Sequence, residues 1–235
     1  MGKGFFITGT DTDVGKTTIA LGLMAALQQQ GLSVVAMKPV SAGCTKTTAG
    51  LRNNDAVQLM QQASLELPYD VVNPYAFEAA IAPHIAAAQN DVTMRIDPLC
   101  RAYEKIAAQA DVVIVEGAGG WQVPLNENET MADLATALGL PVINVVGLRL
   151  GCLNHALLTA ESIAAHGLQH TAWVGNMLCA KMICATENIM TLKQRLPGDC
   201  LGIVPFDVSL SHQRQTPPGK NIARHLNTSL MSIKR

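Results

Sequence analysis

The chain has 235 residues, of which 49% are hydrophobic, 15% charged and 4% aromatic. These proportions exclude a disordered chain and predict a sizeable aliphatic core, held in one large domain or two small ones. Lysine and arginine number 17 and the acidic residues 18, so a net charge of −1 gives no overall attraction to nucleic acid or to an anionic membrane.

Short apolar runs alternate with helical patterns along the chain. Strands are expected at 5–8, 34–37, 111–116, 141–146, 172–178 and 201–204. Helices are expected at about 16–30, 54–64, 99–109, 131–138, 154–166 and 186–195. The consecutive apolar residues of 112–115 are typical of a strand covered on both faces. This order predicts a single α/β domain over residues 1–235, with a mostly parallel sheet and helices on both faces.

Two regions depart from this alternation. Residues 66–98 contain four prolines (68, 74, 83 and 98), and we expect them to run over an edge of the sheet. After residue 207 the chain has cations but no acid, which indicates a solvated C-terminal edge. The apolar residues of the last helical pattern, Ile222, Ala223, Leu226 and Leu230, favour packing against the protein over a membrane anchor.

The six cysteines favour reduced thiols over disulfides. No CxxC pair occurs, and the spacing between Cys179 and Cys184 is poor for zinc. Residues 1–4 lead into a short apolar run without a signal-peptide pattern, and no apolar run approaches the about 18 residues of a membrane span. We therefore expect a cytoplasmic protein that binds neither membrane nor nucleic acid.

The first strand ends in a loop with the chemistry of a phosphate-binding loop. Residues 9–18 offer backbone N–H groups, the Lys16 ammonium for the β- and γ-phosphates and the Thr17 hydroxyl for magnesium, at a strand-to-helix junction. Five residues separate Gly9 from Gly15, where the usual pattern has four. The alternative is an ordinary glycine-rich turn capped by a threonine. The preceding strand and the following helix favour phosphate binding.

Three more charged residues stand at or near strand ends. Glu116 ends an apolar strand and precedes a glycine-rich turn, where a carboxylate organises magnesium in such sheets. Lys38 ends the second strand and would present a fixed cation to an anionic intermediate. Asp55 begins a helical pattern. The alternatives are an acid at a strand's exit to solvent for Glu116, a solvated charge for Lys38 and a helix cap for Asp55.

Taken together, these loops resemble the dethiobiotin synthetase family, the ATP-dependent cyclo-ligases of biotin biosynthesis. The matching segments run in order along nearly the whole chain: 9–17, 38–40, 51–56, 72–75, 115–121, 145–147, 150–156 and 173–176. The long phosphate loop is itself a feature of that family. The resemblance implies a P-loop NTPase-like fold and a homodimer.

The resemblance also implies a reaction. The enzyme would convert 7,8-diaminononanoate, CO2 and MgATP to dethiobiotin, ADP and phosphate, through a carbamate and a carbamic-phosphoric anhydride. Lys16 and Lys38 would be catalytic, because two anions, the carbamate and the γ-phosphate, must be held together. Thr17, Asp55 and Glu116 would hold Mg²⁺, with ATP as co-substrate.

Binding residues follow from the same match. The nucleotide would contact Thr12, Asp13, Val14, Gly15, Lys16, Thr17, Thr18, Asp55, Glu116, Gly117, Ala118, Gly119, Asn176, Met177, Pro205, Phe206 and Asp207. The diamine would contact Lys38, Ser41 and a turn that the family takes from the neighbouring subunit, Gly151, Cys152, Leu153 and Asn154. In three places the sequence departs from the family pattern: Asp13 and His212 each replace a glutamate, and the serine after Lys38 is displaced by one position to Ser41.

Two other classes of protein share the long loop. Amidotransferase-type synthetases of cobalamin synthesis need a glutaminase portion, for which 235 residues leave no room. Dimeric ATPase switches of the chromosome-partition and septum-placement type often have a second lysine early in the loop, whereas positions 10–14 here have none. The switch remains the alternative from a different class, and ATPase activity without the diamine would favour it.

Overall fold

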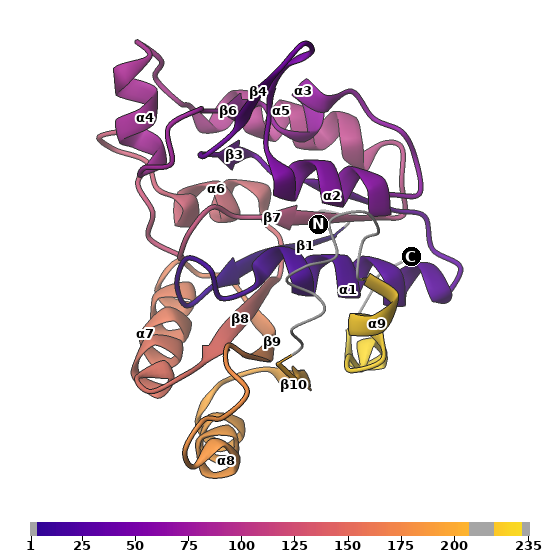
Figure 1. Cartoon of the computed structure of the whole chain (residues 1–235), viewed down its shortest axis with the longest axis vertical. Helices are drawn as coiled ribbons and strands as arrows, with labels where there is room; N and C mark the ends of the chain where they lie inside the picture. The colour runs from indigo at the N-terminus through magenta and orange to yellow at the C-terminus, as the bar shows by residue number, and fades with distance from the viewer. Residues whose placement is uncertain (1–3, 207–218, 232–235) are drawn as a thin grey trace.

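The computed structural model describes residues 4–206 and 219–231, and its centre is a six-stranded sheet (Figure 1). In spatial order the strands are β10 (Asp199–Val204), β9 (His170–Met177), β8 (Val142–Leu148), β1 (Gly4–Gly9), β7 (Val112–Glu116) and β2 (Val34–Met37). Every neighbouring pair in this sheet is parallel. The carboxyl ends of the strands therefore share one edge, where such sheets bind ligands.

Helices cover both faces of the sheet. Along the chain they are α1 (Lys16–Gln29), α2 (Asn54–Gln62), α3 (Tyr69–Val72), α4 (Pro83–Gln89), α5 (Ile96–Ala107), α6 (Met131–Leu138), α7 (Cys152–Ala165), α8 (Ala185–Arg195), α9 (Gly219–Ala223) and the 3-10 turn η2 (Thr228–Leu230). Two small sheets lie outside the main one: β3 (Val40–Ser41) pairs with β6 (Tyr75–Ala76), and β4 (Thr45–Thr47) with β5 (Gly50–Arg52).

The core is divided by the sheet into layers. Phe5 and Phe6 are neighbours in β1 and point to opposite faces. Phe5 packs in the cluster that contains the apolar side of α1 and Ile222 of α9. Phe6 packs in the cluster that contains apolar residues of α5 and α6. Both phenylalanines are buried, which agrees with the expectation of a sheet covered on both sides.

The six expected strands are confirmed, and their ends differ from the expected bounds by at most two residues. The region 66–98 is more regular than we expected, because it contains α3, β6 and the unexpected helix α4. Helix α5 begins at Ile96, before Pro98, and not at 99. Proline is tolerated there because the first turn of a helix does not use its N–H groups.

The C-terminal segment packs on the protein as expected. Ile222, Ala223 and Leu226 are buried, and Gly22 of α1 faces Ile222 at close range. Leu230 differs, with 42% of its surface exposed. Residues 207–218 and 232–235, which include some of the expected C-terminal cations, lie outside the described residues.

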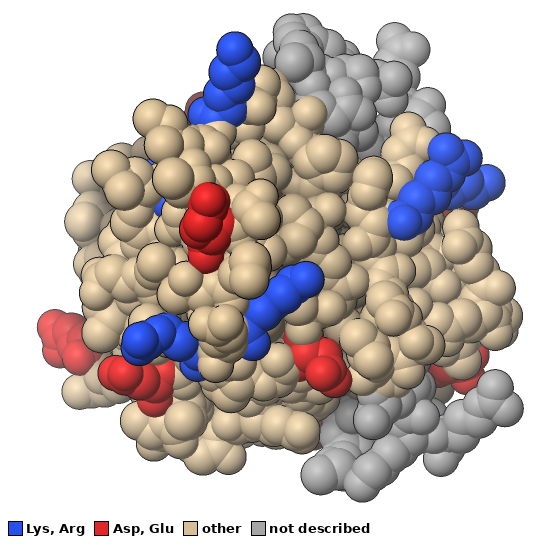
Figure 2. Space-filling view, turned by 90° about the horizontal axis from the view of Figure 1, so that it is seen from below, with Lys and Arg blue, Asp and Glu red and all other residues tan. Residues whose placement is uncertain are grey.

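The surface agrees with the low net charge. Figure 2 shows basic and acidic side chains interspersed on one face, separated by wide areas with neither. All six cysteines lie within the described residues and are free thiols. Within residues 4–206 and 219–231, no helix combines the length and apolar character that crossing a bilayer requires.

Candidate active site

The loop between β1 and α1 has a backbone that only glycine fits at its last position. Gly15 has φ 91°, in the left-handed region, and a Cβ added there would lie 2.2 Å from Nδ2 of Asn176. That amide donates to the carbonyl of Val14 over 2.9 Å. Asp13 also has a positive φ, of 58°, which aspartate adopts more readily than most residues. The loop is therefore held in shape by contact with the end of β9.

Lys16 and Thr17 begin α1 and point into the site. The Lys16 ammonium is buried and donates to the carbonyl of Asp11 over 2.9 Å. Burial, and next the positive charge of Lys38, lower the pKa of Lys16 to about 8. The Thr17 hydroxyl donates to Oε1 of Glu116 over 2.8 Å and so joins the phosphate loop to the end of β7.

Lys38 lies between two carboxylates. Its Nζ is 3.1 Å from Oδ2 of Asp55 and 2.5 Å from Oε1 of Glu116. Lys38 is 5% exposed and Glu116 is fully buried. Burial alone would lower the pKa of Lys38, but the charges of Glu116 and Asp55 outweigh it and raise that pKa. Lys38 is therefore a fixed, buried cation, and the solvated-charge interpretation is wrong.

One cavity, of about 960 Å³, is lined by Lys16, Thr17, Lys38, Asp55 and Glu116. Twelve of the expected site residues line it: Thr12, Asp13, Gly15, Lys16, Thr17, Thr18, Lys38, Ser41, Asp55, Glu116, Ala118 and Gly119. The cavity therefore brings together the two lysines and the two carboxylates on which the sequence interpretation depended.

Other expected site residues lie outside this cavity. Val14 is a core residue that is 1% exposed. Gly117, Asn176, Met177, Pro205, Phe206 and the turn residues Gly151, Cys152, Leu153 and Asn154 do not line the cavity of their own chain. Asp207 lies outside the described residues, as does the departure His212.

Several lining residues were missed by the sequence analysis. Six of them come from two segments, Ala80, Ile81, Ala82 and Pro83 from one and Val123 and Pro124 from the other. They carry no charged or nucleophilic group, so their residue types gave no signal. Asn53 also lines the cavity, and its side chain accepts from the N–H groups of Asp55 and Ala56 at the start of α2. The cap that was considered for Asp55 is therefore Asn53, and the Asp55 carboxylate is left to bind Lys38.

The oxygen atoms at the floor of the cavity suit Mg²⁺. Oε2 of Glu116 is buried and has no hydrogen-bond partner within residues 4–206 and 219–231, and the Asp55 carboxylate and Thr17 hydroxyl come from neighbouring elements. Over the described part of the chain, no cluster of three or more His, Cys, Asp and Glu side chains could hold a metal ion. Mg²⁺ needs no such cluster, because it is usually bound by one or two carboxylates, water and substrate phosphates. The donor set fits the ion.

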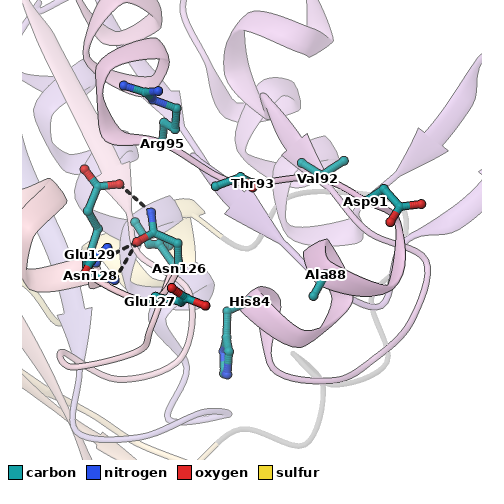
Figure 3. Close-up of a pocket in the computed structure, with 11 residues that line it drawn as sticks. His84, Ala88, Asp91, Val92, Thr93, Arg95, Asn126, Glu127, Asn128 and Glu129 are labelled. Atoms are coloured by element: carbon teal, nitrogen blue, oxygen red, sulfur yellow. Dashed lines mark hydrogen bonds between the residues drawn. The ribbon is translucent and has the colours of Figure 1, made fainter.

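A second cavity, of about 890 Å³, lies beside the first (Figure 3). Consecutive residues divide between the two, with Pro83 in the first and His84 in the second. The second cavity has an acidic lining that includes Asp91, Glu127 and Glu129, and in Figure 3 Glu129 is hydrogen-bonded to Asn126. None of the expected site residues that the structure describes lines it, so the first cavity is the candidate active site.

Comparison with known proteins agrees with this site. A family model described as an AAA domain matches residues 3–214. The chain is 53% identical over 221 residues to the ATP-dependent dethiobiotin synthetase BioD of Cellvibrio japonicus (strain Ueda107), and the match covers 92% of this chain and 97% of that protein. It is 54% identical over 202 residues to the protein of the same name from Pseudomonas aeruginosa (strain UCBPP-PA14), over 86% and 89% of the two chains.

Solved structures of more distant proteins share the fold. The MinC:MinD cell division protein complex of Aquifex aeolicus matches with a TM-score of 0.61 at 16% identity, over 94% of each chain. The septum site-determining protein MinD complexed with Mg-ADP from Pyrococcus horikoshii OT3 matches with a TM-score of 0.57 at 14% identity, over 95% of this chain and 94% of that one. At such identities the likeness establishes a P-loop NTPase-like fold and nothing more. The sequence relatives are far closer, and the chain belongs to the AAA-domain family and, within it, to the ATP-dependent dethiobiotin synthetases.

Proposed function

We propose that this chain is a carbon–nitrogen ligase that converts 7,8-diaminononanoate, CO2 and ATP to dethiobiotin, ADP and phosphate, a step of biotin biosynthesis. One observation carries the proposal: the buried Lys38 ammonium and the Lys16 ammonium face one cavity, with Asp55 and Glu116 beside them. A reaction that joins a phosphoryl donor to a second anion needs such a pair of cations. The family membership of the chain supplies the substrates.

The chemistry follows from the weakness of a carbamate as an electrophile. One amine of the diamine attacks CO2, loses a proton and becomes a carbamate. A carbamate oxygen then attacks the γ-phosphorus of ATP, and ADP leaves. The second amine attacks the carbonyl carbon of the resulting anhydride, phosphate leaves, and the loss of the amine proton completes the cyclic urea. Both amines belong to one molecule, so proximity favours ring closure.

The residues of the cavity have separate tasks in this scheme. Lys16 and the loop N–H groups would bind the β- and γ-phosphates. Lys38 would hold the carbamate beside the γ-phosphate and offset the charge that develops between them. Thr17, Asp55 and Glu116 would hold Mg²⁺, which supplies charge neutralisation at the phosphates when it is bound.

The adenine and ribose would extend beyond the cavity. Asn176, Met177, Pro205, Phe206 and Asp207 are the proposed contacts for that end of the nucleotide. Asn176 and Met177 end β9, whose carboxyl end shares an edge of the sheet with β1. This position supports the assignment, because nucleotides bind along that edge.

The diamine site would be shared between two copies of the chain. Gly151, Cys152, Leu153 and Asn154 begin α7, and no residue of this turn lines the cavity of its own chain. Leu150, directly before the turn, is 97% exposed. Gly151 and Asn154 are exposed, and α7 begins without a side-chain cap, although the N–H of Cys152 donates to the carbonyl of Arg149. The start of a helix suits a carboxylate, so we propose that this turn binds the substrate carboxylate in the partner's site. We also propose that residues 1–235 form one domain and that the protein acts in the cytoplasm, where free thiols stay reduced.

The proposal is tested by incubating the protein with 7,8-diaminononanoate, bicarbonate and MgATP and by mass analysis for the cyclic urea. Lys38→Ala should abolish most product while a non-hydrolysable ATP analogue still binds in calorimetry, because the phosphate loop is intact. Lys46→Ala removes an exposed lysine of β4 outside the cavity and should leave the rate unchanged. ATP hydrolysis without diamine and without product would instead favour the ATPase switch.

A further inference from the structure

The polypeptide that carries Lys38 leaves the main sheet directly before it. Strand β2 ends at Met37, so the ladder of the sheet does not hold Lys38. The C-terminal end of α3 holds it instead. The N–H of Lys38 donates to the carbonyl of Val72 over 2.8 Å, and the carbonyl of Lys38 accepts from Nδ2 of Asn73 over 2.6 Å. Both peptide groups of Lys38 are therefore fixed by two consecutive residues.

Asn73 is buried, with 2% of its surface exposed, and its side chain uses its full hydrogen-bonding capacity. Nδ2 donates to the carbonyls of Lys38 and, over 3.3 Å, of Tyr75. Oδ1 accepts from the hydroxyls of Ser41 and Tyr69, each over 2.8 Å. A buried amide with four such partners is rigid, and it ties the strand β3 to the segment 69–75.

Tyr69 extends this connection to the helix that carries Asp55. Its hydroxyl accepts from the N–H of Asn53 over 2.7 Å and donates to Asn73. Asn53 in turn caps α2 through the N–H groups of Asp55 and Ala56. The guanidinium of Arg52 stacks over the Tyr69 ring, 4.1 Å from its centre, which restricts the ring further. The Tyr69 hydroxyl thus lies between the backbone of Lys38 and the start of α2.

Lys38 and Asp55 meet at 3.1 Å, Lys38 from the link between β2 and β3 and Asp55 from the first turn of α2. We propose that Asn73 and Tyr69 are positioning residues that hold these two segments in register, so that the Lys38 ammonium stays between Asp55 and Glu116. This proposal rests on the function proposed for Lys38. Neither side chain touches the reacting atoms. Both act through the backbone of Lys38 and the cap of α2, and a displacement of about 1 Å in such a group costs up to about a hundredfold in rate.

The test compares two single-hydroxyl deletions. Tyr69→Phe keeps the ring and its contact with Arg52 but removes the hydroxyl between Asn53 and Asn73. Tyr75→Phe is the matched control, because the one bond of its hydroxyl to a described residue is accepted from the N–H of Arg95 over 3.3 Å, outside this network. We expect kcat for dethiobiotin formation to fall about tenfold or more in Tyr69→Phe and to stay near the wild-type value in Tyr75→Phe.

Binding measurements separate positioning from loss of folded protein. The stoichiometry and Kd for a non-hydrolysable ATP analogue should be unchanged in Tyr69→Phe, which would show that the variant is fully folded. The loss of rate then lies in kcat at sites that still bind the nucleotide. Asn73→Asp keeps the size and both acceptor bonds but replaces the donor to Lys38 by an acceptor, and it should lose kcat in the same way. Equal kcat in the two Tyr→Phe variants, or a loss of nucleotide stoichiometry that accounts for the whole rate loss, would overturn the proposal. Absence of product from the wild-type protein would instead contradict the proposed function.

Discussion

Arg149, the residue directly after β8, lies 2.5 Å from the Asp11 carboxylate in the phosphate loop. Its guanidinium binds Oδ2, while Oδ1 accepts from the N–H of Thr12 over 2.8 Å. The Thr12 bond and the Arg149 contact both lower the pKa of Asp11. Since the Asp11 carbonyl accepts from Lys16, this pair holds the segment of the loop that the Lys16 ammonium touches.

We expect Arg149→Ala to weaken binding of a non-hydrolysable ATP analogue by a factor of about two to five. The effect is small because both side chains are 46% exposed, and exposed ion pairs contribute little. In an Asp11→Asn background the same change should have a smaller effect, since the guanidinium has lost its charged partner. Isothermal titration calorimetry of the four proteins measures the coupling.

Arg95→Ala is the control for this cycle, because Arg95 faces Asp97 at 3.8 Å, both side chains are exposed, and Arg95 lines the second cavity and not the candidate active site. It should leave nucleotide affinity unchanged. If Arg149→Ala has the same effect in the wild-type protein and in the Asp11→Asn background, then Arg149 acts on the nucleotide directly and not through the loop.

The fold could be predicted from sequence where apolar runs were unambiguous. The run at 112–115 reads as a buried strand, and it is β7, next to β1 at the centre of the sheet. Helix α4 could not be predicted in the same way, because its sequence Pro83–Gln89 begins with a proline and lies among other prolines. Its stability comes from tertiary burial of Ala86 and Ala87, which a local pattern does not reveal.

The site shows the same division between local and long-range signals. Lys16 and Thr17 were predictable because loop, strand and helix are consecutive in sequence. The contact between Lys38 and Glu116 joins residues 78 positions apart and depends on the pairing of β2 with β7. Asn73 was missed as a site residue because an asparagine before a proline is a common turn signal. The positioning role proposed for Asn73 depends on hydrogen bonds to Lys38, Ser41 and Tyr69, which lie outside its own turn.

Asn144 is a buried polar residue that stability measurements can test. It lies within β8, beside Thr8 of β1 and Trp173 of β9, and none of its surface is exposed. Neither Oδ1 nor Nδ2 has a hydrogen-bond partner among the described residues. Asn144→Val removes both unsatisfied groups and suits a central strand, so we expect the free energy of unfolding to rise by about 1–3 kcal/mol.

Denaturant unfolding of both proteins measures this change. Asn144→Asp, of equal size, is the opposing variant and should be strongly destabilised because it buries a carboxylate without a counter-ion. A loss of stability in Asn144→Val would mean that the amide is satisfied by bound water in solution.

His170 makes the stability of the fold depend on pH. It is 7% exposed, and burial lowers its pKa below the ordinary value of 6.5. Well above pH 6.5 the ring is neutral in both the folded and the unfolded state, and the free energy of unfolding does not depend on its protonation. As the pH falls below 6.5 the unfolded chain binds a proton that the folded protein does not, so stability is lost until the lowered folded pKa is passed. We expect the Tm of His170→Gln to fall less than the Tm of the wild type when the pH is lowered from about 7.5 to about 5.

Thermal unfolding across that range checks the prediction, with His225→Gln as control because His225 is exposed. The control should keep the wild-type slope of Tm against pH. An unchanged slope in His170→Gln would mean that other groups cause the acid sensitivity.

The proposed exchange of turns between subunits predicts complementation between two impaired variants. Asn154 is exposed in the first turn of α7, where an aspartate favours the helix but repels a bound carboxylate. Asn154→Asp should therefore fold normally, bind ATP normally and show a raised KM for the diamine, while Lys38→Ala lacks ring closure.

In a mixed dimer, one site combines Lys38 from one copy with Asn154 from the other. Equal amounts of the two variants, unfolded and refolded together, should recover about a quarter of the wild-type rate at a diamine concentration far below the KM of Asn154→Asp. If the mixture is no more active than the sum of the separately refolded variants, the turn serves the site of its own chain or none at all.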